Sequence, residues 1–496
     1  MKKARKITAM VMALAMATSA MTLAAGCQNQ TAASTAASQA PASSQAAASS
    51  EAASSEAAKP AAAEGKVLNI WCWNTEFQDR FNTYYPEVQE VAKDKSTTTL
   101  KDGTTVKWTI NPNENNNYQN KLDAALQNQD SAAADDKIDI FLVEADYALK
   151  YCNSDYTLDI KKDIGLTDAD LADQYKYTQD LVTDKQNGAI KGTTWQATPG
   201  VFAYRRSFAK KVLGTDDPTK VQEQLSSWDK FNAVAEKAKS NGLMMLSSYE
   251  DSYRVFANNI ANPWVTGTTV TVDPNIMKWV EQQKTFNQKG YTHKVRGQFT
   301  DPAWTADQSP KSKVFGFFYS TWGINFTLEG NSLAKPTKEG GKEEVGNGIF
   351  GDWAVCQGPQ SYYWGGSWIC GCKGSDNIGT INKVMKALTC NKDIMKKITT
   401  DTQDYTNNKS AMNEIANSDF KSAFLGGQNH IKLFANVADK IDMKNCGPYD
   451  QGCTEKFTQA MNDYFDGTVD LTKAKANFEK AIKETYPDLT EVKWPS

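Results

Sequence analysis

The sequence has little of what a metal or nucleotide enzyme needs. Its 496 residues include only two histidines, His293 and His430, and no pair of CxxC motifs, so we expect no metal site. No Walker P-loop or HExxH motif is present. The GxGxxG match at 346–351 follows a charged loop and precedes an expected strand, whereas a dinucleotide site needs a strand before it and a helix after it. We therefore expect no cofactor.

Clustered positive charge is also missing. The formal net charge is −3, and no run of lysine and arginine occurs, so nucleic acid is not an expected partner. Beyond the N-terminus, no apolar stretch is long enough to span a bilayer. The remaining composition, 40% apolar and 23% charged, is typical of a globular chain, and the length suits two or three domains.

The first 26 residues have the composition of a secretory signal peptide. Lys2, Lys3, Arg5 and Lys6 precede an Ala/Met/Leu-rich stretch, and its end, LAAGC, resembles a lipobox. This ending predicts cleavage after residue 26 and attachment of lipid to Cys27. Loss of the four basic residues would take the formal charge from −3 to −7.

Residues 27–65 are expected to form a disordered tether behind the lipidated cysteine. They are almost entirely Ala, Ser, Thr, Gln, Glu and Pro, which bury too little apolar area to fold. A flexible coil of this length would separate its ends by about 30–35 Å. The predicted location is the extracytoplasmic face of a bacterial cell membrane, with the lipid as the only membrane contact.

Eight further cysteines leave two expectations open. They are Cys72, Cys152, Cys356, Cys370, Cys372, Cys390, Cys446 and Cys453. An exported chain can oxidise them, and Cys446 and Cys453, with Gly and Pro between them, are the best local pair. Free thiols are an equally good expectation.

From residue 66 the chain alternates between strand-like and helix-like segments. Residues 66–73, 105–110 and 137–143 are predicted strands, and polar or aromatic residues follow each of them, in the sequences WNTE, NPNE and EADY. Ligands of open α/β sheets bind outside the carboxyl ends of the strands. We therefore expect Trp73 and Asn74 at the rim of a crevice.

Later segments continue this alternation. Residues 193–205 read as two strands broken at Pro199-Gly200, and Ser227 is the expected N-cap of a helix over 228–240. An apolar run over 313–319 leads to Trp322, short strands are expected at 353–356 and 367–371, and the rest is mostly helical, ending with a helix over 471–486. The tryptophans inside regular patterns are expected in the core, namely Trp108, Trp195, Trp228 and Trp279. For Trp73, Trp322, Trp364 and Trp368, core and cleft positions are equally expected.

Three motifs have an enzymatic or metal interpretation that we consider weaker than a plain one. Glu144 and Asp146, or Glu76 with either, could be the carboxylate pair of a glycosidase, but hydrogen bonding to hydroxyls needs the same residues. Ser367 in GGSWI lacks the last glycine of a hydrolase elbow. The asparagine-rich segment 111–120 lacks the glycine and glutamate of a calcium loop, so helix capping and turns are expected, with one or two side chains at the cleft.

The order and spacing of several segments resemble a known family. These segments are KVLNIWCWN, KIDIFLVEADY, TTWQATPGVFAYRR, SSWDKFNAVAEKAK, KVFGFFYSTWG and FDGTVDLTKAKANFEKAI. Together they are similar to the extracellular solute-binding proteins of carbohydrate ABC transporters, the group that includes maltose-binding protein. The resemblance covers about residues 66–490.

This resemblance implies an α/β, two-lobed periplasmic-binding-protein type II fold. Each lobe would be a mostly parallel sheet flanked by helices, with the ligand cleft between the lobes. The first lobe would hold 66–198 and 353–400, and the second 199–352 and 401–496. Pro199-Gly200 would lie at a crossover and absorb hinge rotation.

The resemblance also implies a site and a function. Ligand contacts would come from Trp73, Asn74, Glu76, Glu144, Asp146, Tyr147, Trp322, Trp364, Trp368, Tyr449 and Asp450. A non-enzymatic, monomeric protein would capture a mono- or oligosaccharide by lobe closure and deliver it to permease subunits of an ABC transporter. Three alternatives stay open: the same fold binding a polyamine or peptide, a secreted glycoside hydrolase, and a partner of a sensor.

Overall fold

The first sheet contains the strands predicted at 66–73, 105–110, 137–143 and 367–371, together with two strands that were not predicted, at 88–91 and 97–100. The computed structural model describes residues 64–299 and 301–495, so the predicted signal peptide, Cys27 and nearly all of the tether lie outside the described residues. The sheet has seven strands, in the order β2 (Val88–Val91), β3 (Thr97–Leu100), β4 (Thr105–Ile110), β1 (Val67–Cys72), β5 (Ile140–Glu144), β14 (Ser367–Gly371) and β6 (Thr193–Thr194). Its centre, β4-β1-β5, is parallel, whereas β14 runs antiparallel to β5.

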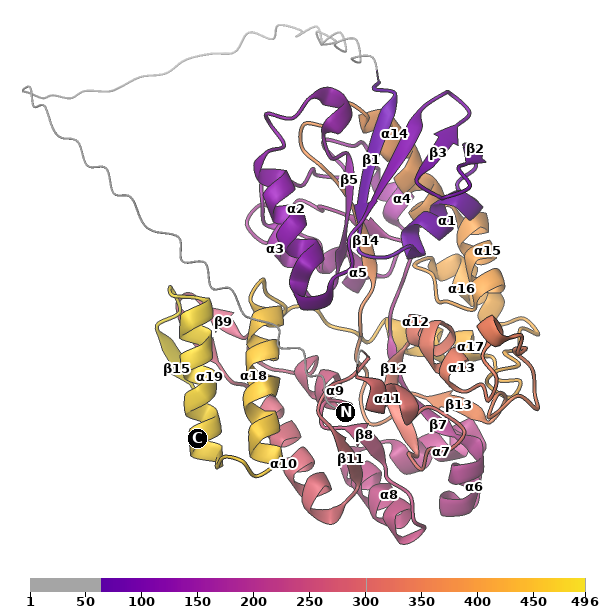
Figure 1. Ribbon diagram of the computed structural model, residues 1–496, viewed down its shortest axis with the longest axis vertical. Coiled ribbons are helices and arrows are strands. Elements are labelled where there is room, and N and C mark those ends of the chain that lie inside the picture. Colours follow the sequence, from indigo (N-terminus) through magenta and orange to yellow (C-terminus); the bar gives the residue numbers. More distant parts are fainter. Residues whose placement is uncertain (1–63, 300, 496) are drawn as a thin grey trace, which may run out of the picture. The chain divides into compact units, whose positions relative to one another are not determined.

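Helices cover both faces of this sheet. They are α1 (Glu76–Tyr84), α2 (Asn117–Gln127), α3 (Ala148–Cys152), α4 (Asp168–Leu171), α5 (Lys176–Asp180), α14 (Ile378–Met385), α15 (Lys392–Thr402) and α16 (Lys409–Ala416). Figure 1 shows α2 and α3 on one side and α1 and α15 on the other. Helix α2 buries Tyr118, Leu122 and Leu126, which share one helical face, and the Tyr118 hydroxyl donates to the Leu142 carbonyl at 2.6 Å.

The second part of the fold has smaller sheets. One is antiparallel, β12 (Gly316–Ser320), β7 (Gly200–Arg205) and β13 (Trp353–Cys356). The others are β11 (Thr292–Val295) with β8 (Leu246–Ser248), and β15 (Glu491–Lys493), β10 (Thr269–Thr271) and β9 (Val265–Thr266). Parallel pairing therefore does not dominate in this part of the fold, although a mostly parallel sheet was expected. Strand β7 carries the chain away from the first sheet, whereas β12 and β13 carry it back, so their directions must oppose.

The helices of this part lie in the lower half of Figure 1. They are α6 (Arg206–Leu213), α7 (Pro218–Leu225), α8 (Trp228–Ser240), α9 (Tyr253–Ala257), α10 (Pro274–Lys289), α11 (Pro302–Ala306), α12 (Thr321–Gly323), α13 (Glu329–Asn331), α17 (His430–Ala438), α18 (Asp450–Phe465) and α19 (Leu471–Thr485). The predicted cap of α8 is confirmed, because the Ser227 hydroxyl accepts from the Lys230 amide.

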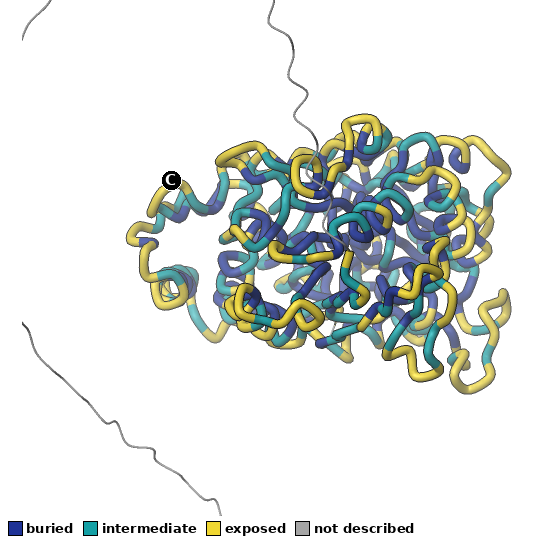
Figure 2. The backbone as a smooth tube through the Cα atoms, turned by 90° about the horizontal axis from the view of Figure 1, so that it is seen from above, coloured by how far each residue is buried: buried dark blue, intermediate teal, exposed yellow. Residues whose placement is uncertain are grey.

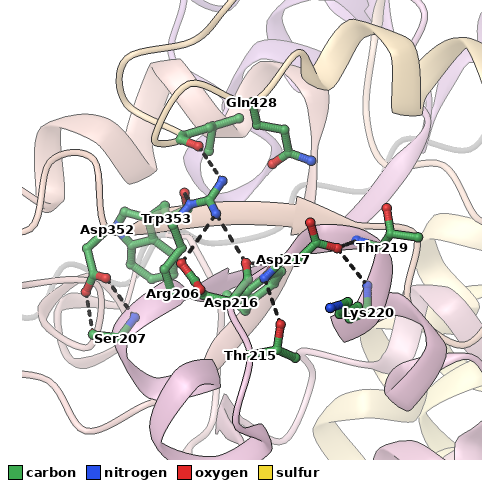
Figure 3. Close-up of polar contacts among 12 residues, drawn as sticks. Arg206, Ser207, Thr215, Asp216, Asp217, Thr219, Lys220, Asp352, Trp353 and Gln428 are labelled. Carbon is green, nitrogen blue, oxygen red and sulfur yellow. Dashed lines mark hydrogen bonds and ion pairs between the residues drawn. The ribbon is translucent and has the colours of Figure 1, made fainter.

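Two neighbouring arginines attach α6 to β13. The Arg206 guanidinium donates from Nε to the Trp353 carbonyl at 2.9 Å and from Nη2 to the Leu425 carbonyl at 2.8 Å (Figure 3). Asp352 accepts from the Ser207 amide at 2.8 Å and from Arg205 Nε at 2.8 Å. The arginine pair of the FAYRR segment is thus structural and lies away from the cleft residues described below.

Buried residues form one large core and a smaller one. Figure 2 shows buried stretches running through the interior and exposed stretches at the periphery. The smaller core gathers aromatic residues of α10, α18 and α19, with Trp279, Phe457 and Phe478 fully buried. Trp195 and Trp279 are buried and Trp108 and Trp228 pack on core residues, which confirms their expected places.

The start of the described chain is fixed to the first sheet's helices. The Glu64 carboxylate accepts from the Gly379 amide at 2.7 Å and the Thr380 amide at 3.1 Å, in the first turn of α14. The Gly65 amide donates to the Asp376 carbonyl at 3.1 Å. A negative side chain at a helix N-terminus is stabilising, so this contact holds residues 64 and 65 against the first sheet's layer.

The described residues also show the state of the cysteines and of the asparagine-rich segment. All eight cysteines found there are free, so Cys446 and Cys453 form no disulfide. Neither a group of three metal-ligating side chains nor a helix fit to cross a membrane occurs within 64–299 and 301–495. Asn115 and Asn116 adopt left-handed turns at φ 54° and 59°, but no asparagine side chain caps α2, so the expected capping is wrong.

Candidate ligand-binding site

Two tryptophans from different sheets meet at the centre of the site. Trp322 lies in α12, two residues after the end of β12, and Trp364 lies three residues before β14. The Trp322 indole N–H donates to the Trp364 carbonyl at 2.9 Å, and the rings pack edge to face at 5.5 Å. Gly365 has φ +74°, and a Cβ there would lie 2.8 Å from Trp322 Nε1. The close approach therefore needs glycine at this turn.

An ion pair beside the tryptophans joins the two parts of the fold. Asp146, just after β5, receives two hydrogen bonds from Arg254 of α9, at 2.8 Å and 2.6 Å. The guanidinium carbon also lies 5.3 Å from the centre of the Trp364 ring. Burial tends to raise the pKa of Asp146, but Arg254 outweighs it and keeps that pKa below its ordinary value. Burial, with Asp146 nearby, raises the pKa of Glu144 well above its ordinary value.

A large cavity of about 730 Å³ lies on one side of this centre. Asp146 and Arg254 line it together with Phe299, Tyr363 and Asp450. Burial raises the pKa of Asp450 to about 7, and its carboxylate accepts from the Gly447 amide at 2.9 Å. The walls thus combine aromatic rings with charged groups of both signs.

A small cavity of about 280 Å³ has Trp322 in its wall. Its walls include Trp322, Phe326, Asn74, Glu76, Arg80, Asn325 and Asp404. Gln196 donates to Glu76 at 2.7 Å and to Asp404 at 3.0 Å, so these two carboxylates face one amide. Burial raises the pKa of Glu76 to about 7, assisted by Asp404 and opposed by Arg80.

A third cavity, here named the outer cavity, has a volume of about 650 Å³. Tyr147 and Tyr449 line it, as do Asn116 and Asn120 of the asparagine-rich segment. The outer and large cavities share wall residues, namely Leu149, Gln451 and Glu455. They are therefore neighbours, whereas the small cavity shares no wall residue with either.

A model of the family described as bacterial extracellular solute-binding protein matches residues 95–423. The match covers well over half of the chain. The chain belongs to this family. Its members bind solutes and are non-enzymatic, so the glycoside hydrolase alternative is set aside.

Solved structures of solute-binding proteins share the fold at low identity. A protein described as extracellular solute-binding protein family 1 matches with a TM-score of 0.65 and 16% identity, covering 86% of this chain and 100% of its own. A binding protein from B. animalis subsp. lactis, in complex with β-1,6-galactobiose, matches with 0.60 and 16%, covering 86% and 100%. MalE from Xanthomonas citri matches with 0.59 and 12%, covering 85% and 97%. No curated protein matches this sequence.

The ligand-binding residues predicted for this solute-binding protein are divided among the three cavities. Asn74, Glu76 and Trp322 line the small cavity, Asp146 and Asp450 the large cavity, and Tyr147 and Tyr449 the outer cavity. Glu144 and Trp364 touch the centre, since a Cβ on Gly365 would lie 3.4 Å from Glu144 Oε1.

Two predicted tryptophans lie away from open space. Trp368 is only 1% exposed within β14, and its indole donates to the Thr178 carbonyl at 2.8 Å, so of the two positions equally expected for it the core position is observed. The strand pleat alternates side chains between faces, and Trp368 points into the layer of α5. Trp73 is half-buried and packs edge to face on Tyr118 and Tyr147.

Sequence reasoning missed the charged residues that come from helices. Arg254 lies inside α9, and Arg80 is in α1, four residues after Glu76. The spacing of Glu76 and Arg80 places them on one helical face, which was a usable signal. Nothing in the sequence around Arg254 connects it to Asp146, because the two are 108 residues apart.

Proposed function

We propose that this solute-binding protein captures a carbohydrate between two lobes and delivers it to the permease of an ABC transporter. The observation that carries the proposal is Trp322, whose indole lines the small cavity beside amides and carboxylates and packs on Trp364, next to Arg254 of the large cavity. A flat ring suits the apolar face of a pyranose, and planar polar groups suit its hydroxyls. The B. animalis relative in complex with β-1,6-galactobiose and a Bifidobacterium longum relative in complex with lacto-N-biose support this solute class.

Lobe closure is the proposed mechanism. Site residues come from both parts of the fold, and the Asp146–Arg254 pair forms only when those parts are close. A solute that contacts both lobes shifts the population toward the closed form. Crossing segments run side by side, since the Gly200 amide donates to the Tyr362 carbonyl at 2.6 Å. We propose the second lobe to include β13, which pairs with β7, and place the return crossover at 357–366.

Membrane attachment is the second part of the proposal. A signal peptide over 1–26, a lipid on Cys27 and a tether over 27–65 would keep the binding lobes beside the permease. Cys27→Ala should release the protein into the medium, and mass spectrometry of the wild-type N-terminus should find a lipidated cysteine. An unmodified Cys27 in membrane fractions would contradict the anchor.

A cationic solute such as a polyamine is the second candidate. Five carboxylates line the large cavity, namely Asp146, Glu250, Asp442, Asp450 and Glu455, with Arg254 and Lys444 opposing them. An acid-lined cavity favours a protonated amine by charge. The carbohydrate remains preferred because Arg254 already neutralises Asp146.

The deciding experiment tests a panel of solutes for binding and uses tryptophan fluorescence and melting temperature as its two readouts. The panel contains mono- and oligosaccharides, polyamines and peptides. A saturable shift with a sugar, without product formation, is the expected result. A response to spermidine alone would replace the carbohydrate with a cation and leave the fold assignment intact.

A further inference from the structure

The outer cavity extends the space of the large cavity along the junction of the two parts of the fold. Its walls come from α2, α3 and the N-terminal turn of α18, with Tyr486 after α19. The two cavities share Leu149, Gln451 and Glu455. Volumes of about 730 and 650 Å³ each lie within the usual range of small-molecule sites. A chain-like ligand in the large cavity would therefore reach the outer cavity next.

The walls of the outer cavity are mostly neutral and polar. Its amide side chains are Asn116, Gln119, Asn120, Asn153, Gln186 and Gln451, and its rings are Tyr147, Tyr449 and Tyr486. Lys150, which also lines it, is paired with Asp123 at 2.6 Å. Amides both donate and accept hydrogen bonds, as sugar hydroxyls do, and tyrosine rings supply flat apolar surface.

Two polar atoms in this wall lack partners within the described part of the chain. Tyr147 is only 4% exposed, yet its hydroxyl makes no hydrogen bond, and the same holds for the buried Oδ1 of Asn153. Buried polar groups are nearly always hydrogen-bonded, and leaving one unpaired is costly. A ligand with hydroxyl groups would satisfy both atoms. The Tyr147 hydroxyl can donate to the ligand or accept from it, and Asn153 Oδ1 can accept from it.

The cavity is also completed by both parts of the fold. Asn116 Oδ1, before α2, accepts from Gln451 of α18 at 3.3 Å. The backbone of Asn116 is left-handed, and its side chain lies in the cavity wall instead of capping the helix. A ligand unit here would thus contact both lobes, as closure requires.

We propose that the outer cavity is a further glycosyl subsite, so that the solute is an oligosaccharide extending from the large cavity to Tyr147 and Asn153. This inference rests on the proposed carbohydrate function and adds a minimum chain length to it. It predicts that affinity rises with chain length up to the unit that fills the outer cavity.

The test is calorimetric titration of the full chain with two sugar series of one to four units. One series contains α-1,4-glucosides and the other β-1,6-galactosides. In the series that binds, longer sugars should bind more tightly than the monosaccharide. Asn153→Ala and Tyr147→Phe should each reduce the ratio of long-chain to monosaccharide affinity about three- to ten-fold, as expected for one hydrogen bond.

Tyr151→Phe is the matched control. Tyr151 lies in α3, between the two tested residues, and its hydroxyl donates to Asp123 at 2.9 Å. It lines none of the three cavities, so the ratio should stay at the wild-type value. Melting temperatures verify that each variant folds. Binding without dependence on chain length, or variants that keep the wild-type ratio, would overturn the subsite alone. Silence from both series would overturn the subsite together with the carbohydrate proposal.

Discussion

The small cavity and the outer cavity offer a ligand different chemistry. The small cavity is charged, because Glu76 and Asp404 face Arg80, whose Nε has no partner among the described residues. The outer cavity is walled mostly by amides and tyrosines, with Lys150, Glu455 and Lys456 as its charged side chains. Charged walls make binding sensitive to pH and salt, whereas neutral walls do not. Binding at the small cavity should therefore respond to pH and salt, whereas binding at the outer cavity should respond to the length of the solute.

Removing the Trp322 side chain should have the largest effect on sugar affinity. Trp322→Ala deletes the ring that lines the small cavity and packs on Trp364, and affinity for the bound sugar should fall about 100-fold or more. Titration calorimetry measures the loss. Trp494→Ala is the control, since that ring packs on Phe457 and Phe478 outside the cavities and should change stability only. Equal losses of affinity would contradict the central role of Trp322.

Breaking the ion pair should have the next largest effect. Arg254→Met leaves Asp146 and Glu144 without their cation, so we expect a loss of about 2 kcal/mol in unfolding free energy at pH 7. Scattering should also find a more open average form. Adding Asp146→Asn removes the unpaired charge and should restore part of the stability. A double variant no more stable than the single one would show that the pair contributes little.

Titration of the small cavity should have a moderate effect. The folded-state pKa of Glu76 is raised to about 7 from 4.5, so its contribution to stability is full below pH 4.5 and is lost as pH rises through 7. Glu76→Gln should therefore stabilise the protein at pH 8 relative to pH 5, by on the order of 2 kcal/mol. Urea unfolding at both pH values measures the difference. Asn153→Ala in the outer cavity should give the same change at both, which makes it the matched comparison.

Trimming the mouth of the small cavity should have the smallest effect. Phe326 is 60% exposed, so Phe326→Ala should alter unfolding free energy by less than about 0.5 kcal/mol. Sugar affinity should fall only about three-fold, through lost contact with the ring. A fall as large as that for Trp322→Ala would mean that the solute sits nearer the mouth than the centre.

The strands of the first sheet can be predicted from the sequence much better than the binding site can. Apolar runs with period two or continuous hydrophobicity predict β1, β4 and β5, and a serine before a helical pattern predicts the start of α8, because both signals are local. Which residues after a strand face which cavity depends on strand direction and on helices far away in sequence. Arg254 and Trp368 illustrate this: the first enters the site from a distant helix, and the second turns away because of the pleat. The antiparallel pairing of β7 likewise follows from the route of the chain between lobes.

The contact of Glu64 with α14 has a mechanical consequence. Any force that reaches the folded body through the preceding chain is applied at residues 64 and 65, on the layer that contains β1. In the proposed closure, the part that contains β1 would stay in place and the part built on β7 would move relative to it. If the chain before residue 64 is held at a membrane, the β7 part would move against a stationary β1 part. A docking permease would then contact one stationary surface and one moving surface.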